Sequence, residues 1–167
     1  MKAETSLRRI FERHFRTDDR DMDEAAVEAA MDIYRLFSVA MRIYTRDTLD
    51  DDLRQDILRS LFTQAVALPN NRFWMTWGSE LRPVLVNAMN IWALAPQYMA
   101  DALEERDDSR SAYLRAQLLQ VQTSFVDVIM AMAFRGMKDF YQNARQLRDD
   151  VMQFTSQHYF DIESGQE

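Results

Sequence analysis

Two runs of apolar residues near the C-terminus repeat every seven residues, and this spacing constrains the fold more than any other feature. The first run passes through Leu114, Leu118, Val121, Phe125, Val128 and Met132. The second begins after Gly136 and passes through Met137, Phe140, Ala144, Leu147, Val151 and Phe154. A repeat of about 3.5 residues puts apolar side chains on a narrow strip of an α-helix, which packs against another helix. Two such strips joined at a glycine predict an antiparallel helical hairpin over residues 109–159.

Glycine and proline are scarce, which extends the helical prediction to the whole chain. The 167 residues include three glycines and three prolines, too few turn-forming residues for a sheet of many strands. A chain of this length can bury a sizeable core as one domain, and we find no repeat or linker that would divide it. We therefore predict a single all-α domain over residues 1–167, a bundle of five to seven helices, with a frayed polar tail at 160–167.

Apolar spacing also places the remaining helices. It predicts helices at residues 5–16, 24–46 and 53–68, a central helix within 73–95, and a short helix over 96–106. The acidic run 17–23 should cap the second helix, because carboxylates stabilise helix N-termini. Proline fits the first turn of a helix but not its interior, so Pro83 predicts that the central helix becomes regular only near Ser79.

Composition excludes several classes of function. The chain has no cysteine, which rules out disulfides, thiolate nucleophiles and cysteine–zinc sites. A formal charge of −7 disfavours a general attraction to nucleic acid or anionic lipid. The N-terminus has no apolar core typical of a signal peptide, and the weakly charged stretch 83–100 is short for a membrane span. We expect a cytoplasmic protein with no membrane partner.

The N-terminal helix has the sharpest charge contrast in the chain. Residues 1–16 contain five basic and two acidic residues, a net charge of +3, so the other 151 residues sum to −10. Such a basic amphipathic helix can engage nucleic acid, a membrane surface or an acidic partner. It can also dock on the protein's own acidic body, or on that of a dimer partner, and we favour this docking. Residues 18–23 would then be a hinge that could leave residues 1–20 mobile. The candidate interaction residues are Arg8, Arg9, Arg13, Arg16, Phe11 and Phe15.

An acidic cluster offers one possible metal site. Four carboxylates share one side of the expected short helix, namely Asp101, Glu104, Glu105 and Asp108. Carboxylate oxygens bind magnesium, and paired acidic helices serve this purpose in some all-α nucleotide pyrophosphatases. The sequence lacks the second acidic pair that this arrangement needs, and Asp127 stands alone on a polar face. We therefore favour a solvated helix end over a metal site, and predict no cofactor.

Other polar residues interrupt the apolar helices. Glu80, Asn87 and Asn90 fall within one arc of the central helix and could line a small polar pocket, since buried amides need hydrogen-bond partners. They could equally mark the solvent edge of that helix. His14 and His158 lie on apolar faces, and we interpret both as histidines packed at the edge of a core rather than as bases or metal ligands.

Part of the central region resembles a known sequence pattern. The resemblance is carried by Phe73-Trp74, Leu81-Arg82-Pro83-Val84-Leu85 and Asn90-Ile91-Trp92. This stretch is similar to a pattern in small uncharacterised all-α proteins of tailed-phage genomes, where an FW pair precedes an L-x-P helix with a later tryptophan. The resemblance implies no activity, but it favours a phage or prophage accessory protein.

These observations favour a non-catalytic function. The chain has no G-x-S-x-G elbow and no glycine-rich phosphate loop, so the usual motifs of nucleophilic and phosphate chemistry are missing. We predict a helical interaction protein that acts by self-association, most simply as a homodimer, or through a protein partner. The first alternative is a magnesium-dependent nucleotide-processing enzyme that uses the acidic helix. The second is nucleic-acid binding through the basic N-terminal helix.

Overall fold

The computed structural model describes residues 2–42, 70–95 and 108–158, together with residues 52, 56, 59, 60, 63 and 98. These residues are helical apart from short connections, and no strand occurs among them, so the predicted all-α class is confirmed. The helices are α1 (Lys2–His14), α2 (Arg20–Arg42), α4 (Arg72–Trp92), α6 (Asp108–Gly136) and α7 (Phe140–His158). The predicted helix at 53–68 falls mostly outside the described residues, and so does the one at 96–106.

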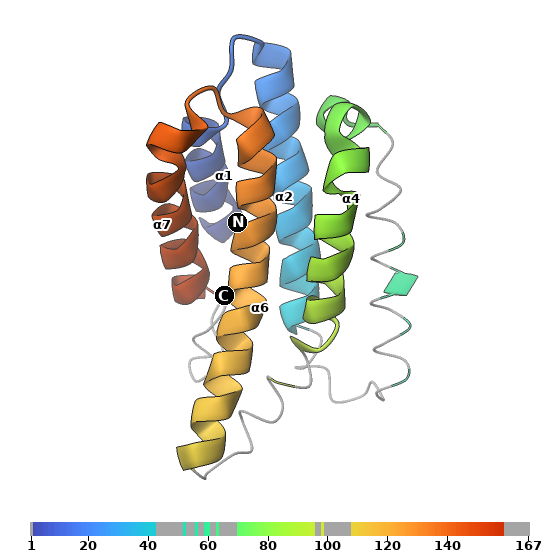
Figure 1. The fold of residues 1–167 in the computed structure, drawn as a ribbon, viewed down its shortest axis with the longest axis vertical. Helices are drawn as coiled ribbons and strands as arrows, with labels where there is room; N and C mark the ends of the chain where they lie inside the picture. The colour runs from blue at the N-terminus through green and yellow to red at the C-terminus, as the bar shows by residue number, and fades with distance from the viewer. Residues whose placement is uncertain are drawn as a thin grey trace.

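The long helix α6 organises the bundle. It packs against α2, α4 and α7, while α1 lies against α2 and α7. In Figure 1, α6 stands in the foreground between α7 and α4, and α1 lies behind. The connections 15–19 and 137–139, and the start of α4, gather at one end of the bundle (Figure 1). Segments far apart in the sequence therefore meet at that end.

The repeats that predicted helix packing do line the core. Ten of their members are buried, namely Leu114, Leu118, Val121, Phe125, Val128, Met132, Met137, Leu147, Val151 and Phe154. At the centre, the ring of Phe125 stacks on that of Phe37 with 4.7 Å between their centroids. Trp92 packs its edge on Phe37 and donates its indole N–H to Ser124 Oγ at 2.7 Å. The polar atom of a large buried side chain is thereby satisfied inside the core.

The start of α2 confirms the expected acidic cap. Asp19 Oδ1 accepts the backbone N–H of Met22 at 3.2 Å, as an N-cap side chain does. Asp23 accepts both the backbone N–H and the hydroxyl of Thr17, at 2.8 and 2.6 Å. These bonds fix the turn between α1 and α2, in the segment that the sequence had suggested as a hinge.

The expected start of the central helix near Ser79 is wrong, because α4 begins at Arg72 and carries Pro83 in its interior. Asn71 sets the true start: its side-chain oxygen accepts the N–H of Phe73 at 2.7 Å, and its amide donates to the carbonyl of Ala25 at 3.0 Å. Pro83 removes one helical hydrogen bond. Since Ser79 and Pro83 are both exposed, water can solvate the carbonyl that this bond would have used. The hydrogen bonds of Asn71 thus outweigh the preference of proline for the first turn of a helix.

The N-terminal helix α1 docks within its own chain, as favoured from its charge pattern. Phe11 and Phe15 are buried, with their rings edge to face at 5.6 Å. Phe15 lies so close to Gly136 that a Cβ atom built there would stand 2.8 Å from its Cδ1. His14 Nε2 lies 2.9 Å from Asp150 Oδ2 on α7. Apolar packing and one largely buried polar pair therefore hold α1 in place.

Candidate functional site

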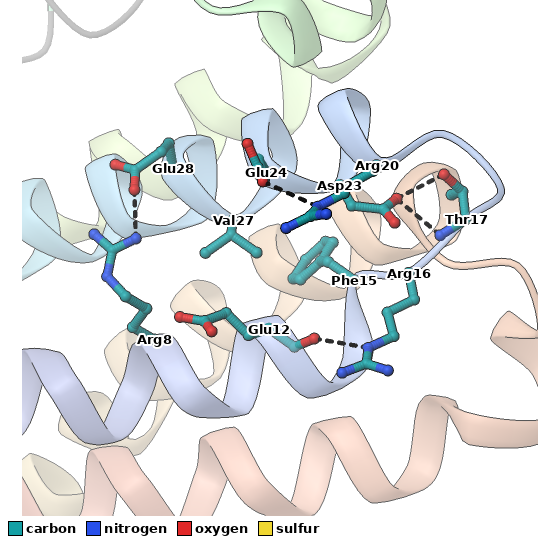
Figure 2. Close-up of a pocket in the computed structure, with 10 residues that line it drawn as sticks. All are labelled: Arg8, Glu12, Phe15, Arg16, Thr17, Arg20, Asp23, Glu24, Val27 and Glu28. Atoms are coloured by element: carbon teal, nitrogen blue, oxygen red, sulfur yellow. Dashed lines mark hydrogen bonds and ion pairs between the residues drawn. The ribbon is translucent and has the colours of Figure 1, made fainter.

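A groove beside the predicted interaction residues runs between α1 and α2. It encloses about 720 Å³ and has buried Phe15 and Val27 at its base. Figure 2 shows charged side chains around this base, with the Arg20 guanidinium lying over the middle of the groove. The charged residues of the lining are Arg8, Glu12, Arg16, Arg20, Asp23, Glu24 and Glu28.

Most of these charges are paired within the protein. Arg8 donates to Glu28 across the groove, and this hydrogen bond and its charge attraction raise the pKa of Arg8 above its ordinary value. Arg20 pairs with Glu24 one turn along α2 at 3.5 Å. Arg16 Nε donates to the carbonyl of Glu12 at 3.1 Å. We interpret the groove as the polar edge of the α1–α2 contact, since most of its charged side chains form ion pairs with one another.

The other predicted interaction residues are also placed by the docking of α1. Arg13 Nη1 lies 3.5 Å from Asp150 on α7, whereas Arg9 is exposed. Phe11 and Phe15 belong to the core, so in the docked state they are not available to an outside partner. Arg8 and Arg13 thus pair with carboxylates on neighbouring helices, while Arg9, Arg13 and Arg16 remain exposed.

The remaining candidates do not come together in a site among the described residues. Glu80, Asn87 and Asn90 are exposed on α4, and Glu80 accepts from Arg135 Nε at 3.1 Å. His158 packs on the ring of Phe154, with 4.5 Å between centroids. Asp101, Glu104, Glu105 and the side chain of Asp108 lie outside the described part of the chain. Within that part, no group of three or more acidic or histidine side chains could hold a metal ion.

A surface that the sequence reasoning missed lies at the α6–α7 connection. Phe134, Phe140 and Tyr141 form a mutually packed triangle with centroids 5.4 to 6.1 Å apart, all in edge-to-face geometry. Phe134 is 49% exposed and Tyr141 is 85% exposed. We call these three residues, together with Arg135, the aromatic patch. Phe134 and Tyr141 face solvent, while Phe140 is half-buried and packs against the edge of the core.

Arg135 links the aromatic patch to α4. Its guanidinium carbon lies 5.5 Å from the ring centre of Phe134 and 6.0 Å from that of Trp77. It also forms the ion pair with Glu80 and donates to the carbonyl of Ala131 at 3.0 Å. Cation–π contact and two polar partners hold the side chain in one position. The patch is therefore an ordered surface of aromatic rings and one arginine, the residue types enriched where proteins bind proteins.

The sequence held a partial signal for this patch. Phe134, Phe140 and Tyr141 flank the predicted turn at Gly136, a place where polar residues are usual. The heptad spacing assigned Phe140 to the core strip and gave no role to the other two. Only the packed turn shows that the exposed rings of Phe134 and Tyr141 meet the half-buried ring of Phe140 at the edge of the core.

Comparisons with known proteins supply no relative from which a function could be transferred. No protein-family model matches the chain, and neither a curated protein nor a solved structure matches it significantly. The candidate site therefore rests on the chemistry of the chain itself: an ordered aromatic surface, with no set of reactive groups assembled among the described residues.

Proposed function

We propose that this protein is a non-catalytic helical interaction protein that docks another polypeptide on its aromatic patch. The observation that carries the proposal is the aromatic triangle of Phe134, Phe140 and Tyr141 beside Arg135, in which Phe134 and Tyr141 are exposed. The proposal includes a bundle of five to seven helices in which α6 and α7 form a C-terminal antiparallel hairpin that presents the patch at its turn. It further places the protein in the cytoplasm, as a phage or prophage accessory factor.

The energetics of such a surface support docking. Aromatic rings offer large contact areas with few rotatable bonds, so they lose little entropy on binding. The rings of the patch already brace one another, and Arg135 is already held by Glu80 and Trp77. A partner would therefore meet a preorganised surface, which lowers the ordering cost of association. A tyrosine that is 85% exposed contributes little to the fold itself.

The test is site-specific photocrosslinking in producing cells. A photoreactive phenylalanine analogue replaces Tyr141, and in a matched control it replaces Met75, which is 74% exposed on α4. We expect a discrete crosslinked polypeptide at position 141, identified by mass spectrometry, and none of that species at position 75. The proposal fails if the two positions give the same pattern, or if position 141 captures nothing.

A further inference from the structure

The solvent side of α6 carries a second regular strip, opposite the one that lines the core. Its members follow one another at steps of three or four residues, which keeps them on one face of the helix. Leu119 is 51% exposed and Phe134 is 49% exposed, while Thr123 and Met130 are half-buried. We call this set the outer strip: Ala112, Ala116, Leu119, Thr123, Asp127, Met130 and Phe134.

The outer strip is unusually poor in charge. Surface helices normally carry charged residues opposite their buried face, yet residues 111–134 contain only Arg115 and Asp127. Within Ser111–Gly136 an 18-residue window has a mean hydropathy of 1.2, and 56% of that window is buried. This segment is long and apolar enough to cross a membrane by length and composition alone. The helix therefore carries few charges on the side that faces water, where Leu119 and Phe134 lie among the polar residues Thr123 and Asp127.

Side-chain size changes along the outer strip. Its N-terminal end has the small residues Ala112 and Ala116, and its C-terminal end has the large residues Met130 and Phe134. An antiparallel copy centred on Thr123 would bring Phe134 level with Ala112 of that copy, Met130 level with Ala116, and Asp127 level with Leu119. Large residues opposite small ones let helices pack closely. A parallel copy would instead set phenylalanine against phenylalanine and alanine against alanine.

We infer that the occupant of the outer strip is a second copy of this chain, packed antiparallel along α6 about a two-fold axis at Thr123. This inference rests on the proposed function and names its partner, because Phe134 belongs both to the strip and to the aromatic patch. Because of the two-fold symmetry, the aromatic end of each copy contacts the small-residue end of the other, so the same contact occurs twice. Tyr141 extends the contact from α6 onto the start of α7.

Area and charge both fit a second copy. Aromatic side chains bury roughly 150–250 Å² each, so the exposed parts of Leu119, Phe134 and Tyr141 supply roughly 300 Å² of apolar surface per copy. A standard interface buries about 800 Å² per partner around an apolar centre. Two chains of charge −7 repel over most of their surfaces, but the outer strip brings only one carboxylate per copy to the contact. A partner recognised by charge would gain little from this face.

Analytical ultracentrifugation of the full chain tests self-association. We expect the wild type to shift from monomer to dimer with rising concentration. Leu119→Glu should raise the dimer dissociation constant by about tenfold or more, because the antiparallel register places it level with Asp127 of the other copy and the two carboxylates repel. Val86→Glu is the matched control, since Val86 is also an exposed aliphatic residue, 41% exposed on α4, and it should leave the constant unchanged. Circular dichroism verifies that both variants fold. A wild type that stays monomeric at every concentration overturns the inference.

Cysteine crosslinking tests the antiparallel register. The chain has no native cysteine, so only the introduced thiols can react. Thr123→Cys should crosslink to itself through a short bismaleimide. Ala116→Cys and Met130→Cys should crosslink when mixed with each other, but not alone. Efficient self-crosslinking of Ala116→Cys would overturn the antiparallel arrangement. The two proposals can fail separately. If the chain stays monomeric in ultracentrifugation and photocrosslinking at position 141 captures a different protein, the second copy is refuted and the proposed function stands. If photocrosslinking at position 141 captures nothing, the proposed function is refuted.

Discussion

Replacing Gly136 by alanine should loosen the docking of α1. A Cβ atom at this position would stand 2.8 Å from Phe15 Cδ1 and 3.3 Å from Phe15 Cε1, with Phe73 Cε2 at 3.5 Å. Contacts below about 3.0 Å force atoms to move. Phe15 is only 1% exposed, and the open space nearest to it is the groove between α1 and α2, whose base it lines. The strain must therefore be relieved by a displacement of the Phe15 ring toward that groove or by a shift of α1 against α6.

The expected cost follows from overpacking in a closed core, which is about 1–3 kcal/mol of unfolding free energy. The gain in helix propensity is small at Gly136, because it is the last residue of α6. Gly78 is the matched control: it lies within α4, and a Cβ atom there meets nothing within 4 Å. Gly78→Ala should therefore stabilise the protein by about 0.5–1 kcal/mol.

Urea unfolding, followed by circular dichroism, measures both variants, and scanning calorimetry should show melting shifts of about 2–4 °C per kcal/mol for a chain of this size. A double-mutant cycle with Phe15→Leu tests the cause. Because the smaller side chain leaves room for the methyl group, Gly136→Ala should cost less in that background. If Gly136→Ala is as stable as the wild type, or if its cost is unchanged when Phe15 is leucine, the close approach of α1 to α6 is not what requires glycine.

Three further changes probe the contacts that position the helices. Asn71→Ala removes the N-cap of α4 and should lower the unfolding free energy by about 1 kcal/mol in urea titrations; an unchanged midpoint would argue against the cap. Asp150→Ala leaves the largely buried His14 without its partner and should cost about 1–3 kcal/mol, measured against Asp149→Ala on the exposed side of α7. Burial raises the pKa of Asp32, with Arg35 offsetting only part of the effect. The folded state therefore binds this proton more tightly, and the stability that the carboxyl contributes is lost as pH rises through its folded pKa. Asp32→Asn should accordingly be more stabilising at neutral pH than below the pKa of the unfolded carboxyl, and the opposite trend in pH-dependent melting would refute this.

Periodic features were predictable from sequence because burial follows helical geometry. The repeats through Leu118, Phe125 and Val151 identified core positions, since only one face of each helix can meet its neighbours. The docking of α1 followed from its opposite charge and its apolar face. These inferences need no knowledge of which helix is adjacent to which.

Features that depend on a particular neighbour were not predictable in the same way. Pro83 argued for a late start of α4, but Asn71 bonds both its own helix and Ala25 on α2, and this contact spans 46 residues. The aromatic patch needed the packed turn to bring Phe134 against Tyr141. The spacing of residues within one helix does not show which residues of another helix they contact. Neither the start of α4 nor the aromatic patch could therefore be predicted from the sequence.

The helix α6 shows where sequence reasoning about burial becomes ambiguous. A helix that is apolar all round is expected to be surrounded by protein or lipid, and residues 111–134 fit that description with two charges. In the described structure α2, α4 and α7 pack against it, yet Leu119 and Phe134 are left about half exposed. The binding face that we propose rests on this exposed apolar surface along a regular strip. The gradient from Ala112 to Phe134 then favours an antiparallel copy, because only that arrangement pairs the small end with the large end at both ends of the contact.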